Sequence, residues 1–268
     1  MSLHAVRKQA TACARPDSQF GKAWSILDEL VALTSSPSSI ISPQIVPEVL
    51  RRSSKLVGRN EKHMPSSLNL SGVFADAISE HLTVIRQFVA QEDAFERAAA
   101  RITDCLLAGN KILWCGNGGS AADSQHLAAE LVGRFHRTRR AFPSIALTTD
   151  SSVLTAIAND WSYDDVFKRQ VEALCVAGDV LVGISTSGNS KNVCAALAKA
   201  RELGAFTVAM TGRSGGRMAI LADVCLRVPA VDPARIQEGH ILCGHILRER
   251  IELAACITDA VAVEGGAP

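Results

Sequence analysis

Short apolar runs alternate with amphipathic helical stretches through most of the chain. The apolar runs cover residues 112–115, 144–148, 180–185, 206–211 and 224–228. Helical periodicity separates most of them, at residues 166–176, 190–203 and 217–221. Continuous apolar strands that alternate with helices are typical of a parallel sheet covered by helices on both faces. The pattern therefore predicts an α/β fold with a five-stranded parallel sheet.

Helical patterns also lie before and after the predicted sheet. One has apolar positions at Phe74, Ile78, Leu82, Ile85, Phe88 and Val89, and a second at Phe95, Ala99, Ile102 and Leu106. The second should end at Gly109, because glycine readily adopts the left-handed conformation that closes a helix. A long final helix should run from near Ile236 into the 250s.

Residues 1–66 differ from the rest of the chain in composition. Ser, Pro and Arg crowd residues 34–67, which is typical of linkers. One short amphipathic helix fits residues 21–33, with Trp24, Leu27, Leu30 and Val31 on one face. We therefore predict a linker-like extension at residues 1–66 and a single globular domain at residues 67–268.

A glycine-rich turn follows the first predicted strand. Its sequence is Cys115-Gly116-Asn117-Gly118-Gly119-Ser120. A helical pattern starts directly after it, with Ser120 as the expected N-cap. Such a turn can hold an anionic group, because backbone N–H groups point outward and the helix dipole adds roughly half a positive charge. The helix carries His126 and Glu130 on one face. A plain turn would explain the glycines alone, and a solvated ion pair would explain His126 and Glu130 alone. The two together favour a functional site.

Polar residues also follow the third predicted strand, and ligands of parallel sheets bind where strands end. The run at residues 180–184 continues as Ser185-Thr186-Ser187-Gly188-Asn189-Ser190 and then as a helix. Hydroxyls and backbone amides at a helix N-terminus favour a phosphate monoester. The alternative is a polar turn in which Ser190 only caps the helix. Asn159 and Asp160 should close a small loop, where they either bind sugar hydroxyls or form a turn.

Further polar residues gather at the start of the final helix. It opens Arg235-Ile236-Gln237-Glu238-Gly239-His240 and continues through His245. Polar side chains in a mostly apolar helix need partners or solvent. A buried, hydrogen-bonded histidine usually explains a single such residue, but Gln237, His240 and His245 together favour a functional role.

Composition narrows the classes of partner. The 268 residues are 47% hydrophobic and 21% charged, as in an ordinary globular protein. A formal net charge of +1 gives no electrostatic reason to expect nucleic acid or an anionic membrane as partner. The eight cysteines show no CxxC pair, which suits a reducing cytoplasm. No apolar run reaches the roughly 18 residues of a membrane span.

The motifs at residues 115–130, 185–190 and 235–245, in this order and spacing, resemble the bacterial sedoheptulose-7-phosphate isomerases. These enzymes, also called phosphoheptose isomerases, belong to the SIS (sugar isomerase) domain superfamily. The resemblance implies an SIS-type three-layer sandwich preceded by a helical pair. The serine loop is common to SIS domains, whereas His126 and Glu130 with Arg-Ile-Gln-Glu and His245 are more specific to the heptose enzymes. One departure is Ala234, where an acid often precedes Arg-Ile-Gln.

The resemblance also implies a role for each motif residue. Substrate contacts are implied for Asn117, Gly118, Gly119, Asn159, Asp160 and Gln237, and phosphate contacts for Ser185, Thr186, Ser187 and Ser190. One zinc ion per subunit is implied at His126, Glu130, Gln237 and His245. Glu130 and His245 match the catalytic pair of the family.

The implied reaction converts D-sedoheptulose 7-phosphate to D-glycero-D-manno-heptose 7-phosphate, the first step toward nucleotide-activated heptoses. Moving a proton between adjacent carbons through an enediol(ate) requires a base and a donor or cation at the developing oxyanion. Glu130 suits the base and His245 the acid, and zinc would polarise the carbonyl. Two rival functions remain: a non-catalytic SIS scaffold that binds the bacterial replication initiator, and a sugar-phosphate-sensing SIS module. Glu130 and His245 favour the enzyme.

Helix geometry bears on the assembly. Gln237 and His245 should lie about 12 Å apart along one regular helix, too far to share an ion with bonds of about 2 Å. Either the helix begins irregularly at Gln237, or sites combine groups from two subunits. The SIS enzymes that the chain resembles are homotetramers with sites at subunit interfaces. We therefore expect a homotetramer with shared sites. Whether Glu130 and His245 of one site come from one chain or from two tests this expectation.

Overall fold

The structure, a computed structural model, describes residues 72–133 and 140–264, the end of this range (257–264) by its backbone alone. The predicted extension at residues 1–66 and its helix at residues 21–33 lie outside the described residues, and the boundary near residue 66 stays a prediction. Within the described part, no helix is both long and apolar enough to cross a bilayer.

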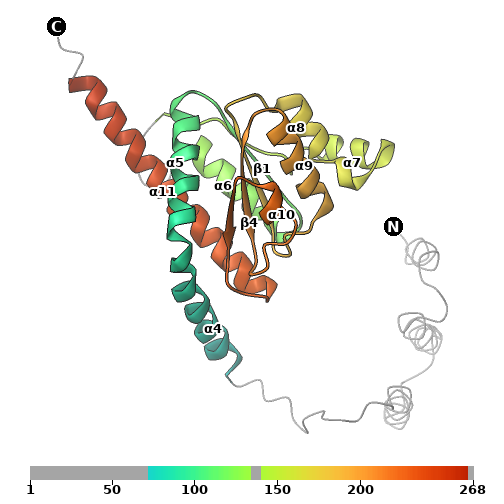
Figure 1. Ribbon diagram of the computed structural model, residues 1–268, viewed down its shortest axis with the longest axis vertical. Coiled ribbons are helices and arrows are strands. Elements are labelled where there is room, and N and C mark those ends of the chain that lie inside the picture. The colour runs from blue at the N-terminus through green and yellow to red at the C-terminus, as the bar shows by residue number, and fades with distance from the viewer. Residues whose placement is uncertain (1–71, 134–139, 265–268) are drawn as a thin grey trace, which may run out of the picture. The chain divides into compact units, whose positions relative to one another are not determined.

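Five parallel strands form the central sheet, as the apolar runs predicted (Figure 1). They are β1 (Ile112–Gly116), β2 (Ser144–Ala146), β3 (Val180–Ser185), β4 (Phe206–Thr211) and β5 (Val224–Arg227). Their order across the sheet is β2-β1-β3-β4-β5. Because β1 and β3 are hydrogen-bonded neighbours with Gly116 opposite Ile184, the turns that follow these two strands come together at one edge.

Alternate residues of β1, β3 and β4 enter two separate hydrophobic cores. In β1, Ile112 and Trp114 join the core on one face, whereas Leu113 and Cys115 join the core on the other face. All four side chains are at most 1% exposed. A strand buried on both faces needs apolar residues at every position, which explains why the runs are continuous rather than alternating.

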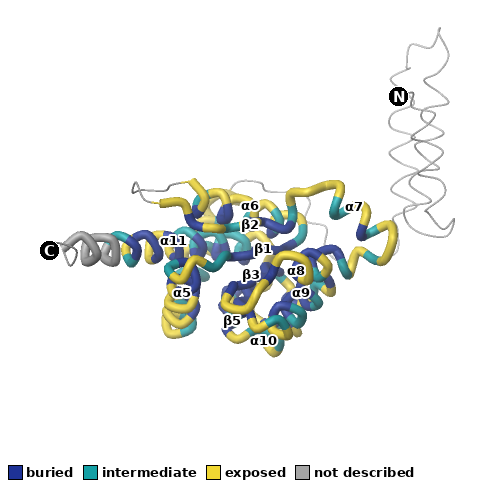
Figure 2. The backbone as a smooth tube through the Cα atoms, turned by 90° about the horizontal axis from the view of Figure 1, so that it is seen from above, coloured by how far each residue is buried: buried dark blue, intermediate teal, exposed yellow. Residues whose placement is uncertain are grey.

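Helices cover both faces, which gives the three-layer SIS-type sandwich. The face of Ile112 is covered by α5 (Glu92–Leu107), α6 (Gly119–Val132) and α11 (Pro233–Glu264). The face of Leu113 is covered by α7 (Ser151–Asp160), α8 (Lys168–Leu174), α9 (Lys191–Glu202) and α10 (Met218–Leu221). Figure 2 shows α5 and α11 on one side of the sheet and α8 and α9 on the other. The predicted end of the second helix is confirmed, because Gly109 has φ 84°.

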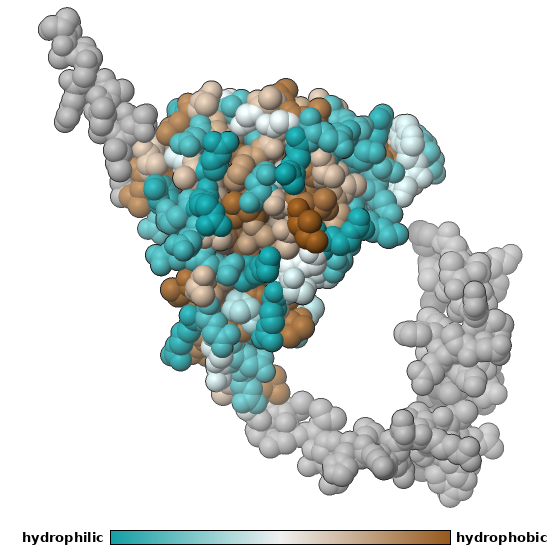
Figure 3. All heavy atoms as spheres, in the orientation of Figure 1, coloured by the Kyte–Doolittle hydropathy of each residue, from teal (hydrophilic) through white to brown (hydrophobic). Residues whose placement is uncertain are grey.

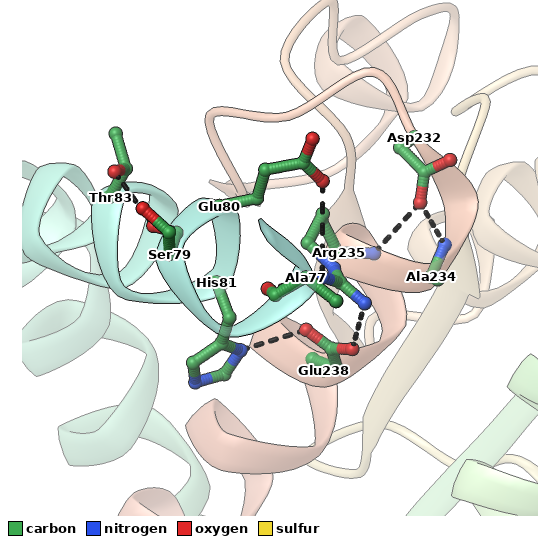
Figure 4. Close-up of polar contacts among 9 residues, drawn as sticks. All are labelled: Ala77, Ser79, Glu80, His81, Thr83, Asp232, Ala234, Arg235 and Glu238. Atoms are coloured by element: carbon green, nitrogen blue, oxygen red, sulfur yellow. Dashed lines mark hydrogen bonds and ion pairs between the residues drawn. The ribbon is translucent and has the colours of Figure 1, made fainter. Parts of the chain in front are cut away.

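Helix α4 (Val73–Phe88) precedes α5, and the short 3₁₀ turn η1 (Val89–Gln91) joins them, so the predicted helical pair is present. Arg235 of α11 attaches α4 to the body (Figure 4): its guanidinium donates to the Ala77 carbonyl and to Glu238 Oε1 at 2.6 Å. Glu238 Oε2 in turn contacts His81 Nδ1 at 2.7 Å. The outward apolar positions of α4 remain exposed, Phe74 by 83%, and Figure 3 shows hydrophobic side chains at the surface over this helix.

The N-terminus of α6 differs from the sequence prediction. Helix α6 begins at Gly119 with Gly118 as N-cap, so the prediction of Ser120 as N-cap was wrong; Ser120 lies in the first turn and is 3% exposed. Gly118 fills this position at a φ of 57°, which strains residues that have a side chain but not glycine. Ser190 does stand at the N-cap of α9, but its side chain makes no capping hydrogen bond.

Helices α7 and α11 also differ from the sequence predictions. Asn159 and Asp160 were expected in a loop but are the last two residues of α7. The Asp150 carboxylate caps this helix by accepting from the Val153 amide at 2.9 Å. The final helix also starts earlier than expected, at Pro233, because Asp232 Oδ1 accepts from the amides of Ala234 and Arg235.

Candidate active site

The carboxyl ends of β1 and β3 place the two predicted ligand loops side by side. The glycine turn at residues 116–119 leaves β1 and starts α6, and the serine loop at residues 185–190 leaves β3 and starts α9. Two helix N-termini therefore meet at one edge of the sheet. Both place the positive end of a helix dipole at this edge, which suits an anionic ligand.

The serine loop is closed by its own hydroxyls. Ser185 Oγ lies 2.9 Å from Ser190 Oγ and 3.4 Å from Ser187 Oγ, so three hydroxyl groups converge on one spot. Thr186 sits between them and accepts the Gly212 amide with its carbonyl at 3.0 Å. Gly188 must be glycine, because its φ is +66° and a Cβ there would meet the Gly215 carbonyl oxygen at 2.2 Å. This convergence exceeds what a simple capping turn requires.

A second cluster joins α6 to α11. His126 Nε2 lies 3.1 Å from His245 Nε2 and 3.3 Å from Glu130 Oε1, and His245 Nε2 lies 3.8 Å from the same carboxylate oxygen. The side chains of His126 and His245 are 52% and 37% exposed, whereas Glu130 is 15% exposed. The cluster is therefore open to a ligand from the side of the histidines.

Arg248 contacts the Glu130 carboxylate at the oxygen that does not face the histidines. Its Nε lies 2.8 Å from Glu130 Oε2, and its side chain is 2% exposed. The two oxygens of Glu130 are therefore distinct: Oε2 faces the guanidinium, and Oε1 faces the two histidines. Sequence reasoning missed Arg248, although it stands three residues after His245 and so shares its helix face.

The cluster fits a zinc ion by its donor chemistry. His126, Glu130 and His245 offer two ring nitrogens and a carboxylate oxygen within 4.8 Å of one another. Donors bound to tetrahedral zinc at about 2.0–2.1 Å lie about 3.3 Å apart, which agrees with the contacts of 3.1, 3.3 and 3.8 Å. Two histidines with one glutamate are a donor set of catalytic zinc sites, which keep a fourth position open.

Gln237 lies apart from this cluster. Its amide rests on Gly119, where a Cβ would come within 2.4 Å of Gln237 Nε2. Gly119 precedes His126 by about 10 Å along α6. The helix is regular through Gln237, since it begins at Pro233, so an irregular start does not bring this side chain to His245. Glu130 and His245, in contrast, meet within one chain, so this pair does not need a second subunit.

The remaining predicted residues lie around the two loops or away from them. Asn117 lies in the glycine turn and pairs with Asn192 of α9 at 2.9 Å. Asn159 and Asp160 are exposed at the end of α7, where Asn159 Nδ2 donates to Asp160 Oδ1 at 2.9 Å. Asn192 and its neighbour Tyr163 were not predicted. The signal for Asn192 was its place in the first turn of the helix after the serine loop.

His240 has a structural role. It is 1% exposed, and its Nε2 donates to the Thr211 carbonyl at 3.2 Å, which ties α11 to the end of β4. Burial lowers the pKa of His240 to about 4, because the charged ring would lose its hydration. The ring is therefore neutral near pH 7. Of Gln237, His240 and His245, it is His240 that is explained as a buried, hydrogen-bonded histidine.

Comparison with known proteins places the chain in a family. A family model described as "SIS domain" matches residues 74–212. The phosphoheptose isomerase of Aliarcobacter butzleri (strain RM4018) is 52% identical over 182 residues, which are 68% of this chain and 96% of the relative. That of Aquifex aeolicus (strain VF5) is 56% identical over 158 residues, 59% of this chain and 83% of the relative.

A solved structure supports the same assignment. The phosphoheptose isomerase of Neisseria gonorrhoeae shares 45% identity with this chain at a TM-score of 0.65. The match covers 69% of this chain and 99% of the solved one. The chain is a sugar-phosphate isomerase that belongs to the phosphoheptose isomerase family of SIS-domain proteins.

Proposed function

We propose that the chain converts D-sedoheptulose 7-phosphate to D-glycero-D-manno-heptose 7-phosphate through an enediol(ate). The observation that carries this proposal is the cluster of His126, Glu130 and His245, where α11 meets α6, the helix that begins at the glycine turn. A scaffold has no use for a carboxylate and two histidines in contact. The relatives are named phosphoheptose isomerases, which supports the same reaction.

Glu130 acts as the base in this proposal. Its Oε1 moves the proton between the two adjacent carbons of the sugar, while Arg248 holds Oε2 at 2.8 Å and thereby fixes the plane of the carboxylate. His245 gives and receives protons at the two sugar oxygens, since its Nε2 lies on the same side as Glu130 Oε1. General acid–base transfer by positioned groups contributes typically 10²–10⁴-fold.

Zinc is the metal that we propose for the cluster. His126, Glu130 and His245 would hold it, and the resemblance adds Gln237 as a fourth ligand. Glu130 Oε1 and His245 Nε2 can transfer protons only while they are not bound to the ion, so the ion would be loosely held or displaced during turnover. Because Gln237 rests on Gly119 within the chain, a movement of its side chain or a second subunit would be needed to bring a glutamine to the same ion. Bound zinc would supply Lewis-acid polarisation of a carbonyl.

The substrate contacts follow from the two loops. Ser185, Thr186, Ser187 and Ser190 hold the phosphate with hydroxyls and backbone amides. Asn117, Gly118, Gly119 and Gln237 border the sugar beside them, and Asn159 and Asp160 are the outer contacts. The glycine turn lets the backbone approach the sugar closely, which side chains at these positions would prevent.

We also propose a homotetramer with its sites near subunit interfaces, in the cytoplasm. The support for assembly is the exposed apolar side of α4 and the open side of the cluster, where His126 is 52% exposed. A second subunit would shield both. The support for location is that the described cysteines are free thiols, most of them buried.

A coupled assay tests the reaction directly. The purified chain is given D-sedoheptulose 7-phosphate, and aldose formation is followed. We expect turnover that requires the 7-phosphate, so that unphosphorylated sedoheptulose is a far poorer substrate. Binding of the sugar phosphate without turnover would instead identify a sensing module, and absence of both would point to a scaffold.

A further inference from the structure

Two asparagine side chains form a reciprocal amide pair between the two ligand loops. Asn117 Nδ2 donates to Asn192 Oδ1 at 2.9 Å, and Asn192 Nδ2 donates to Asn117 Oδ1 at 2.9 Å. Asn117 belongs to the glycine turn, and Asn192 to the first turn of α9. Asn192 is 3% exposed, so its side of the pair is sheltered from water, where an amide hydrogen bond is stronger.

A backbone group sets the orientation of this pair. The Val193 amide donates to Asn192 Oδ1 at 2.9 Å. Because a backbone N–H can only donate, the Asn192 atom that faces it must be the oxygen. The Asn192 nitrogen therefore points to Asn117, and the Asn117 atom that receives it must also be an oxygen. One backbone N–H thus fixes the orientation of both side chains.

Tyr163 completes the set of donors. Its hydroxyl donates to Asn117 Oδ1 at 3.3 Å, from the 3₁₀ turn η2 (Tyr163–Asp165). An amide oxygen has two lone pairs, and Asn192 and Tyr163 together occupy both on Asn117. One of the two N–H groups on Asn117 Nδ2 is used by Asn192 Oδ1. None of the hydrogen bonds among the described residues uses the second N–H of Asn117 Nδ2. This N–H can therefore donate to a ligand.

We propose that Asn192 and Tyr163 are positioning residues that make Asn117 a hydrogen-bond donor to an oxygen of the sugar substrate. This inference rests on the proposed isomerase function and concerns the same site. A donor suits the carbonyl, hydroxyl or enediolate oxygens of a ketose, all of which can accept. An asparagine free to rotate by 180° would offer its oxygen half of the time and would repel a developing oxyanion.

The experiment compares neutral variants by steady-state kinetics with D-sedoheptulose 7-phosphate. Asn192→Ala frees the Asn117 amide, and kcat/KM should fall at least about tenfold, as for loss of one aligned donor. Tyr163→Phe removes one donor to Oδ1 and should lower kcat/KM about fivefold, the worth of about 1 kcal/mol. Tyr163 is 57% exposed, so this second variant should fold normally. Asn110→Ala, at the opposite edge of the sheet before β1, is the matched control and should keep wild-type kinetics.

Two further readouts separate a positioning role from general support of the loop. Inorganic phosphate is used as a competitive inhibitor, and its inhibition constant should stay within about twofold in both variants, because the serine loop keeps its own contacts. In an Asn117→Ala background, neither Asn192→Ala nor Tyr163→Phe should cause any further loss, since residues that act through Asn117 are not additive with it.

The outcomes distinguish this inference from the proposed function. Additive losses, or weaker inhibition by phosphate in parallel with the loss of turnover, would overturn the positioning role while the isomerase stands. If Asn192→Ala does not fold, unchanged kinetics of Tyr163→Phe would overturn it equally. A wild-type protein without turnover would overturn the proposed function and this inference with it.

Discussion

Histidines at three positions of the chain have different surroundings, and these decide what each can do. His126 and His245 lie partly exposed with their Nε2 atoms 3.1 Å apart. His240 is buried with its Nε2 on a backbone carbonyl. Only the first two can reach a ligand from outside, and only the third is kept neutral by burial.

The exposed pair leads to a prediction about zinc. Protein purified without chelator should carry zinc, and both His126→Ala and His245→Ala should lower its metal content, because each removes one of three donors. Metal analysis gives the stoichiometry. Added zinc should raise the melting temperature of the metal-free wild type but not of the variants, since a ligand stabilises only the protein that binds it. His240→Gln is the control, and loss of zinc from it alone would contradict the assignment.

The buried histidine leads to a prediction about pH. The pKa of His240 is about 4 in the folded protein and 6.5 in the unfolded chain. Between these values the unfolded state binds more protons, so the free energy of unfolding should fall as the pH falls from 6.5 to 4. The contribution above pH 6.5 is about 3 kcal/mol, and it is lost in this window.

Urea unfolding at several pH values measures this effect. In His240→Gln the slope of stability against pH between 4 and 6.5 should be shallower than in the wild type, whatever the change in absolute stability. Asn110→Ala, which removes no titratable group, should leave the slope unchanged. Equal slopes in His240→Gln and the wild type would show that another group governs this pH range.

Among the helices, the crossing of α6 and α11 builds the His126, Glu130 and His245 cluster. The two helices approach closely at Gly244, where a Cβ would meet Leu127 Cδ2 at 2.4 Å. The absence of a side chain at Gly244 thus sets the distance across which Glu130, His126 and His245 meet. Overfilling such a contact typically costs 1–3 kcal/mol.

A double-mutant cycle tests this crossing. Gly244→Ala should lower the free energy of unfolding by about 1–3 kcal/mol, and it should also lower activity, because α11 carries His245 away from Glu130. Leu127→Ala removes the atoms that the new methyl would meet. In that background Gly244→Ala should be nearly neutral for stability. Equal costs in both backgrounds would show that the contact with Leu127 is not the cause.

At the scale of the whole molecule, helix α4 presents an apolar side that the other described residues leave exposed. Val73, Phe74, Ile78 and Leu82 are exposed by 59, 83, 47 and 46%. Arg235 and Glu238 hold the other side of the helix to the body through Ala77 and His81, so the exposed side is held in a fixed place. Contiguous exposed apolar residues of this kind mark interfaces.

Assembly gives a prediction with a matched control. Phe74→Ser with Ile78→Ser should shift the protein from the proposed tetramer toward smaller species in size-exclusion chromatography with light scattering. Ile220→Ser is the control, because Ile220 is exposed by 82%, nearly as much as Phe74, but lies on α10. A tetramer that survives the α4 changes would place the interface elsewhere.

Local patterns in the sequence determined the sheet and the place of the site. A strand buried on both faces is largely apolar along its length, so β1, β3 and β4 were predictable nearly to the residue. The edge strand β5 was predictable from its apolar start, although it ends in the exposed Arg227. The places of the glycine turn and the serine loop were predictable too. Each follows a strand of a parallel sheet, and the carboxyl ends of such strands lie at the same edge. Helix α7 was missed, although Asp150 before Val153 gave the local signal of its N-cap.

Partners that are distant in sequence depended on the tertiary structure. His126 and His245 are separated by 119 residues, and Asn117 and Asn192 by 75. Periodicity shows which face of a helix is buried but not which helix covers it or where the two cross. The ion pair of Arg248 with Glu130 and the separation of Gln237 from His126 follow from that crossing. The sequence alone indicated which residues are candidates for the chemistry, and the packing of α11 on α6 decided which of them meet.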